Sequence, residues 1–114
     1  MVGQAIYSKA KGIALASGTG ADVSKYYNVT VLVNVTTLGT SPAVTFASGS
    51  STAQSNNAKM ILPDGTTGYV FNPTATGVYV LSYIGDDPYL KQTTTGTSTV
   101  TAVVALLEKP TLSN

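Results

Sequence analysis

Two adjacent carboxylates, Asp86 and Asp87, are the residues of this sequence best placed for chemistry. They stand in the stretch IGDDP (84–88), and with the carbonyls of a glycine-containing loop they offer the oxygen ligands that Ca²⁺ prefers. A turn in which both carboxylates accept hydrogen bonds from backbone amides uses the same residues and is far commoner. We therefore predict no metal site here, and no cofactor.

The residue types that most catalytic mechanisms need are missing. The chain has no Cys and no His, which excludes thiol nucleophiles, Cys/His zinc sites and imidazole as a proton carrier near neutral pH. The stretch GTGADVSK (18–25) lacks the third glycine of the dinucleotide fingerprint and the Gly-Lys-Ser/Thr ending of a P-loop. No Ser or Lys stands in a recognisable catalytic motif. We predict that the protein is not an enzyme and has no catalytic residues.

Tyrosine is the one residue type that suggests ligand binding. Its amphipathic ring can stack on a sugar while its hydroxyl forms hydrogen bonds. Tyrosine on strands is also ordinary packing and interface material, and we favour that interpretation. A carbohydrate-binding β-sandwich module is the alternative function. The seven tyrosines are Tyr7, Tyr26, Tyr27, Tyr69, Tyr79, Tyr83 and Tyr89.

Charged residues make up only 10% of the 114 residues, and there is no Arg among them. Nucleic-acid-binding proteins carry a basic stripe in which arginine makes bidentate contacts, so we predict no nucleic-acid partner. The longest apolar run, AVVALL (102–107), is much shorter than the roughly 20 residues of a membrane span. We predict no membrane partner either.

Two long segments have the period-two pattern of β-strands. In KYYNVTVLVNVTT, from Lys25, the residues expected on one face are Tyr27, Val29, Val31, Val33 and Val35. STVTAVVALLE, from Ser98, has apolar residues on both faces, which indicates that the other sheet covers one face and a partner or arm the other.

Shorter strand-like segments separated by turn sequences complete the pattern. No stretch of helical period reaches ten residues, so we predict an all-β fold, an antiparallel, jelly-roll-like β-sandwich of about eight strands. Residues 1–24 are expected to form an N-terminal arm or edge strand, 25–109 the sandwich, and 110–114 a frayed tail. The polar segment ASGSSTAQSNN (47–57) is expected to be a mobile loop.

A short internal repeat marks two turns. TTLGTS (36–41) and TTTGTS (93–98) each end one strand-like run and precede another. We predict two hairpins in which Gly39 and Gly96 take the positive-φ position.

The second of these turns lies in a longer pattern. A Gly-x-Tyr strand, then YLKQ, then a Thr-rich strand that breaks at TGTS and resumes as TVTAVVALLEK resembles small structural proteins from the head gene clusters of tailed bacteriophages. TTLGTSPAVTF (36–46) and PDGTTGYVF (63–71) resemble an earlier hairpin and turn of that pattern, so the resemblance covers about residues 25–109. Thr99 stands where the second proline is usual.

The resemblance implies a capsid decoration (cement) protein that sits on the assembled head, often as a trimer. Its partners would be the major capsid protein and further copies of itself. It would be synthesised in the host cytoplasm and would be located on the virion surface. Another virion part, such as a head-fibre or tail subunit, is a further possibility. On this hypothesis the arm and the apolar face of the last strand make the subunit and capsid contacts, through Ile6, Tyr7, Ile13, Leu15, Val103, Ala105 and Leu107.

Overall fold

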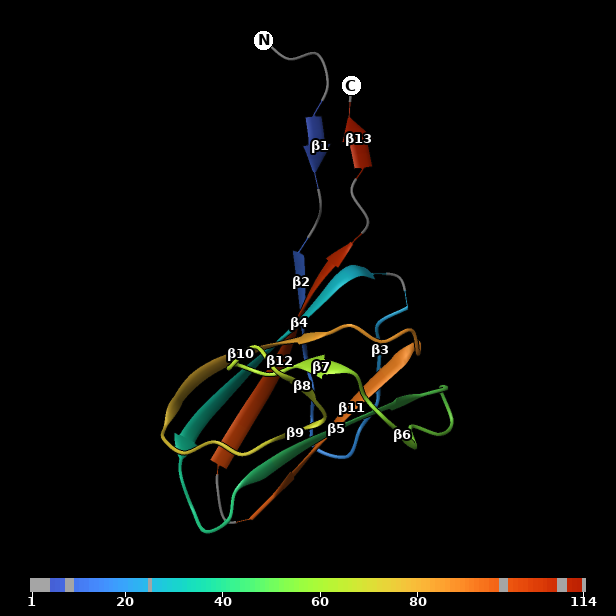
Figure 1. Cartoon of the computed structure of the whole chain (residues 1–114). Coiled ribbons are helices and arrows are strands. Elements are labelled where there is room, and N and C mark those ends of the chain that lie inside the picture. Colours follow the sequence, from blue (N-terminus) through green and yellow to red (C-terminus); the bar gives the residue numbers. More distant parts are fainter. Residues whose placement is uncertain (1–4, 8–9, 25, 97–98, 109–110, 114) are drawn as a thin grey trace.

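The computed structural model describes residues 5–7, 10–24, 26–96, 99–108 and 111–113, and the side-chain surroundings of 12–24 and 29–96. Its regular elements are all β-strands, and two antiparallel sheets pack face to face (Figure 1). The predicted antiparallel β-sandwich is confirmed. No helix among these residues could span a bilayer.

Each sheet combines strands from distant parts of the chain. The six-stranded sheet has the order β2 (Ala10–Ala14), β12 (Thr99–Glu108), β4 (Tyr26–Thr37), β10 (Gly77–Tyr83), β7 (Met60–Ile61) and β8 (Thr67–Gly68). The five-stranded sheet has the order β3 (Ala21–Asp22), β11 (Tyr89–Thr95), β5 (Ala43–Gly49) and β6 (Asn56–Asn57), and β9 (Val70–Phe71) also pairs with β5.

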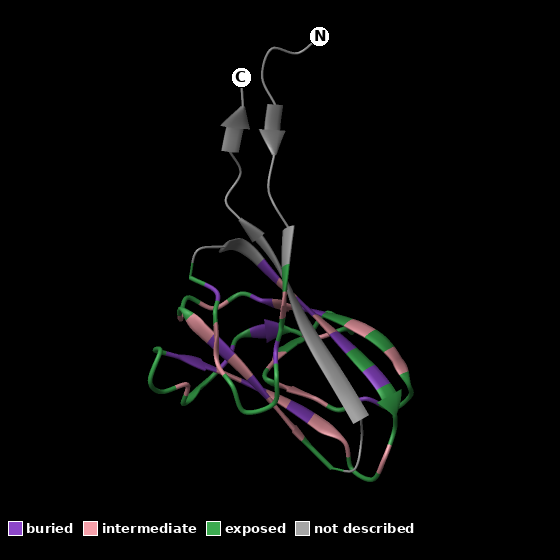
Figure 2. Ribbon diagram, turned by 180° about the vertical axis from the view of Figure 1, so that it is seen from behind, coloured by how far each residue is buried: buried purple, intermediate pink, exposed green. Residues whose placement is uncertain are grey.

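The core lies between the two sheets and follows the alternation of the long strands. In β4, Val29, Val31, Val33 and Val35 are buried, as the sequence pattern predicts; the side chain of Tyr27 lies outside the described part. The five-stranded sheet contributes Val44, Phe46 and Leu90, which are also buried. The alternation of buried and exposed residues along the strands is visible in Figure 2.

Two repeated turns connect the sheets rather than forming hairpins. β4 and β5 belong to different sheets, and so do β11 and β12, so the loops after Thr37 and Thr95 both cross the sandwich. Gly96 has φ +87°, as predicted, whereas Gly39 does not have positive φ and Ser41 does, at +49°. The two predicted hairpins are wrong, because both loops connect strands of different sheets, and in the first loop Ser41 takes the positive φ that was predicted for Gly39.

Replacing Gly96 should destabilise the fold more than replacing Gly65. Both have φ near +90°, where an added side chain costs about 1–2 kcal/mol. A Cβ at Gly96 would also lie 2.7 Å from the backbone oxygens of Thr40 and Ser41, whereas a Cβ at Gly65 meets nothing within 4 Å. We expect Gly96→Ala to lower the free energy of unfolding by at least twice as much as Gly65→Ala in urea denaturation. Equal losses would contradict this packing of the two loops.

Only part of the polar segment 47–57, which the sequence predicts to be a loop throughout, lies outside the strands. Residues 47–49 are the end of β5, and Ser48 is buried. The remaining turn is closed by the amide of Ser50, which donates to the carbonyl of Ala53 at 2.9 Å. Gly49 is required there, because a Cβ would lie 2.1 Å from the Ala53 oxygen.

Residues near both ends of the chain run side by side. β2 pairs along the outer edge of β12, in register from Ala14 with Val103 to Ala10 with Leu107. Farther out, β1 (Ala5–Tyr7) pairs with β13 (Thr111–Ser113), and Figure 1 shows this terminal ribbon projecting from the sandwich. Residues 10–14 therefore form an edge strand, which pairs with β12 along its edge instead of covering its face.

Candidate interaction surface

The outer face of the six-stranded sheet is the surface best suited to binding. Ladder registers place residues directly opposite one another on that face: Val80 opposite Leu32, Leu32 opposite Val103, and Val103 opposite Ala14. Its members, none of them charged, are Ala10, Gly12, Ala14, Asn28, Thr30, Leu32, Asn34, Ile61, Thr67, Val78, Val80, Ser82, Thr101, Val103, Ala105 and Leu107.

Large apolar side chains are exposed on this outer face. Val78 is 63% exposed and Val80 is 53% exposed, and Ile61 is exposed beside them on β7. The next pair along the β10–β7 ladder is Ile84 with Lys59, since the Ile84 amide donates to the Lys59 carbonyl at 2.8 Å. Ile84, which is 50% exposed, therefore extends the same face, and Lys59 opposite it places a charge at the margin of that face. Contiguous exposed apolar surface is typical of an interaction site.

The sequence alone points to only part of this surface. Val103, Ala105 and Leu107 are in register with Leu32, Thr30 and Asn28, which places all three predicted contact residues on the outer face. Val78 and Val80 are not predicted, because both faces of β10 carry large side chains and alternation does not distinguish the inner face from the outer one.

The predicted contact residues of the N-terminal segment fall in three different places. Ile6 and Tyr7 lie in the terminal ribbon, opposite Leu112 and Thr111. Ile13 is partly buried against the core, and Leu15, 1% exposed, is part of the core itself. Leu15 is therefore not available to a partner.

The Asp86–Asp87 loop is tied down by its own protein contacts. One oxygen of the Asp87 carboxylate accepts hydrogen bonds from Ser48 Oγ at 2.8 Å and from Asn56 Nδ2 at 3.2 Å. The Tyr83 hydroxyl donates to the Asp87 carbonyl at 2.9 Å, and burial raises the pKa of Tyr83. Within the described residues, no group of three or more Asp, Glu, His or Cys could hold a metal ion.

Two carboxylates should make the fold sensitive to acid. The hydrogen bond from Ser48 holds the pKa of Asp87 below its ordinary value of 3.8, and that from the Thr66 hydroxyl does the same for Asp64. A pKa that is lower in the folded state stabilises the fold above the unfolded value, and this contribution is lost as the pH falls through the folded value. We expect the melting temperature to fall as the pH drops below about 4.

Asp87→Asn should make the melting temperature depend less on pH below about 4, because the Asn amide keeps an acceptor oxygen but does not titrate in this pH range. The melting temperature measured between pH 7 and pH 2 checks this. Asp86→Asn is the matched control, since Asp86 is exposed and makes no side-chain hydrogen bond within the described part of the chain. A profile as steep in Asp87→Asn as in the unmodified protein would contradict the role of Asp87.

The described tyrosines do not form one sugar-stacking platform. Tyr83 is buried, and Tyr79 donates its hydroxyl to the Ala75 carbonyl at 2.7 Å and packs on Phe71 with ring centroids 4.8 Å apart. Tyr89 is half-buried, and Tyr69 is exposed at the margin of the six-stranded sheet. The side chains of Tyr7, Tyr26 and Tyr27 lie outside the described part.

Comparisons with known proteins leave the family open. No protein-family model matches the chain, and no curated protein matches it. Among solved structures, the chain is similar to the SPBc2 prophage-derived protein YomS, at 14% sequence identity and a TM-score of 0.46, over 92% of this chain and 96% of that one. The neighbour is a prophage protein, but similarity at this level transfers neither its fold family nor a function to this chain.

Proposed function

We propose that the protein is a non-enzymatic structural protein of a tailed-phage virion, which binds the outside of the assembled capsid and stabilises it. On this proposal it acts on no substrate and uses no cofactor. The observation that carries the proposal is the outer face, a sheet surface with exposed valines and isoleucines that carries a charge only at its margin, on Lys59. The resemblance of residues 25–109 to small phage head proteins is the reason for proposing a phage capsid as the structure to which the protein binds.

A further copy of the same chain is the partner that best fits the outer face. With strands about 4.8 Å apart and about 3.4 Å per residue, the face has a flat area on the order of 500 Å². Packed against an equal area of a neighbouring copy, this face would bury on the order of 1,000 Å² in total, the lower limit for a specific interface. Its members carry no charge, so the face suits self-association. In the trimer that the resemblance implies, each outer face packs on a different patch of the next copy, because packing on the same face would give a dimer.

The terminal ribbon is the element proposed to contact the capsid. Two strands alone are at best marginally stable in water, so a ribbon that projects from the sandwich gains stability from a third surface. The ribbon strands β1 and β13 contain Ala, Ile, Tyr, Thr, Leu and Ser and no charge. Many such weak contacts, repeated over a capsid lattice and linked within an oligomer, give strong total binding through effective concentration.

Light scattering after size-exclusion chromatography, followed by sedimentation with undecorated heads of the encoding phage, tests the function. The expected results are a mass three times the 11.6 kDa of the chain and saturable cosedimentation with the heads. Decorated heads should also resist heating better than bare ones. Failure to bind the heads at any concentration would refute the decoration function, and a monomer at every concentration would refute the self-association.

A further inference from the structure

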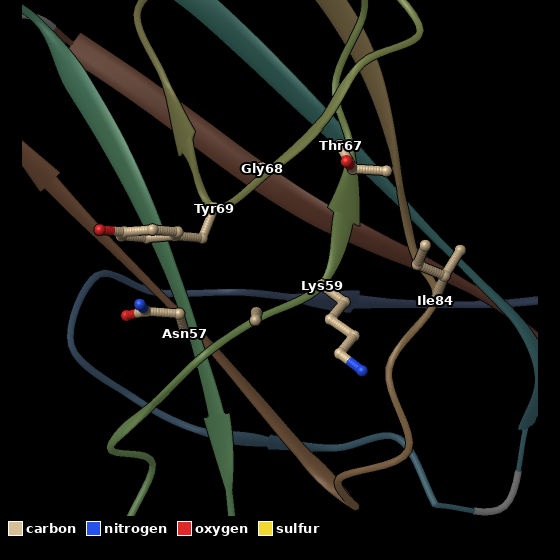
Figure 3. Close-up of a pocket in the computed structure, with 7 residues that line it drawn as sticks. Asn57, Lys59, Thr67, Gly68, Tyr69 and Ile84 are labelled. Atoms are coloured by element: carbon tan, nitrogen blue, oxygen red, sulfur yellow. The ribbon is translucent and has the colours of Figure 1, made fainter.

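A cleft of about 400 Å³ opens beside the outer face, where the chain crosses between the sheets (Figure 3). One side is formed by residues 57–59, which lead from β6 into β7, and the other by residues 67–69, which lead from β8 towards β9. Ile84, just after β10, completes the wall. The volume lies within the range of small-molecule sites.

Tyr69 is presented to this cleft from a fixed backbone. Its carbonyl accepts a hydrogen bond of 2.7 Å from the amide of Phe46, a core residue of β5. The side chain is nevertheless 40% exposed, and within the described part of the chain it has neither a hydrogen bond to its hydroxyl nor a ring partner. Unlike Tyr79 and Tyr83, Tyr69 therefore makes no hydroxyl hydrogen bond or ring contact with a described residue that would account for an aromatic side chain here.

Polar groups flank the ring in the manner of a mixed polar and apolar ligand site. Figure 3 shows the Asn57 side chain beneath the Tyr69 ring, with Lys59 and Ile84 on the other side of the opening. The Asn57 amide can both donate and accept hydrogen bonds, and the Lys59 ammonium can donate. An aromatic face, an aliphatic wall and hydrogen-bonding groups of both kinds match a ring that has C–H faces and hydroxyl edges.

The charges nearby favour an uncharged ligand. A second hollow of about 280 Å³ shares Asn57 and Lys59 with the cleft and adds Asp86 and Asp87. The proximity of Lys59 contributes to the low pKa of Asp87, so the lysine charge is offset by a carboxylate beside it. An anionic ligand that extends from the cleft into this hollow would meet two carboxylates.

We propose that the cleft binds an uncharged pyranose, such as a hexose or N-acetylhexosamine unit of a surface polysaccharide, by stacking its C–H face on Tyr69. Asn57 and Lys59 bind its hydroxyl groups, and Ile84 packs against its aliphatic edge. The adjoining hollow accepts the next sugar unit. This site lies at the margin of the surface proposed for self-association, with which it shares Thr67 and Ile84, and sugar binding there does not depend on the capsid function.

Nuclear magnetic resonance titration of the full-length protein tests the site. The probes are triacetylchitotriose and maltotriose as uncharged sugars and trigalacturonate as the anionic one. The expected result is a saturable shift of the amide signals of Asn57, Gly68 and Tyr69 with one of the uncharged sugars. Tyr69→Ala should weaken that binding about tenfold, and Tyr69→Phe should retain it, because the ring face and not the hydroxyl makes the stacking contact.

Leu38→Ala is the matched control, since it shortens an exposed apolar side chain in the loop after β4 and should bind as the unmodified protein does. No saturable shift with either uncharged sugar, tighter binding of trigalacturonate, or binding unaffected by Tyr69→Ala would overturn the proposal. The oligomeric mass of Tyr69→Ala is measured alongside. A fall in that mass without any sugar binding would assign the cleft to the subunit interface instead.

Discussion

Deletion of residues 1–16 should destroy the cooperative folding of the sandwich, whereas deletion of residues 1–7 should leave it folded. The longer deletion removes β2, which pairs with β12 over five residues, and with it Leu15, which is 1% exposed in the core. It also removes the Leu15 carbonyl, which accepts a 2.9 Å hydrogen bond from Gln92 Nε2. Gln92 is 2% exposed, so its amide would lose a buried partner.

Single substitutions give the scale of this effect. Leu15→Ala alone should lower the free energy of unfolding by about 2–5 kcal/mol, as large-to-small changes in a core do. Leu38→Ala, at an exposed leucine, should change it by no more than about 0.5 kcal/mol. Urea denaturation followed by circular dichroism measures both variants and both deletions. If the protein without residues 1–16 unfolded cooperatively at the midpoint of the full chain, the edge-strand role of β2 would be wrong.

The shorter deletion separates folding from capsid binding. It removes β1 and leaves β2, Leu15 and the core in place. On the proposed function it should weaken cosedimentation with phage heads while the melting temperature stays within a few degrees. Full binding by this variant would exclude the terminal ribbon as the capsid contact.

Long strands are predictable from this sequence because each repeats a local pattern many times. Alternation over 12 residues of β4 identifies both the strand and its buried valines. The two-residue strands β3, β6, β7, β8 and β9 carry no period, since a strand of two residues forms by pairing with a neighbouring strand rather than by its own pattern. These short strands add to the roughly eight that the sequence pattern predicts.

The candidate surface was harder to predict than the fold. The outer face combines β2, β12, β4, β10, β7 and β8, and only strand order and register reveal which residues share it. Leu15 is predicted as a contact residue but is buried in the core, because an apolar residue in a weakly patterned segment is compatible with either an arm or a core. No sequence pattern indicates that Leu15 and Gln92 lie close together, although their hydrogen bond helps to attach this segment, together with the pairing of β2 and β12.

Val80→Lys should dissociate the oligomer without unfolding the subunit. Val80 is 53% exposed and lies opposite Leu32 in the middle of the outer face, so water can solvate the new ammonium in the free subunit. In a sheet-to-sheet interface the same charge would be buried without a partner, which is strongly unfavourable. Light scattering should show the mass falling from the oligomer to 11.6 kDa, with the free energy of unfolding of the subunit changed by about 0.5 kcal/mol or less.

Two controls separate the place of the charge from the charge itself. Val80→Thr keeps the β-branched shape without a charge and should retain most of the association. Thr95→Lys adds the same charge on the other sheet, where Thr95 is exposed at the end of β11, and should leave the mass unchanged. An oligomer that survives Val80→Lys but is lost on deletion of residues 1–7 would place the subunit contact in the terminal ribbon, because that deletion leaves the outer face intact.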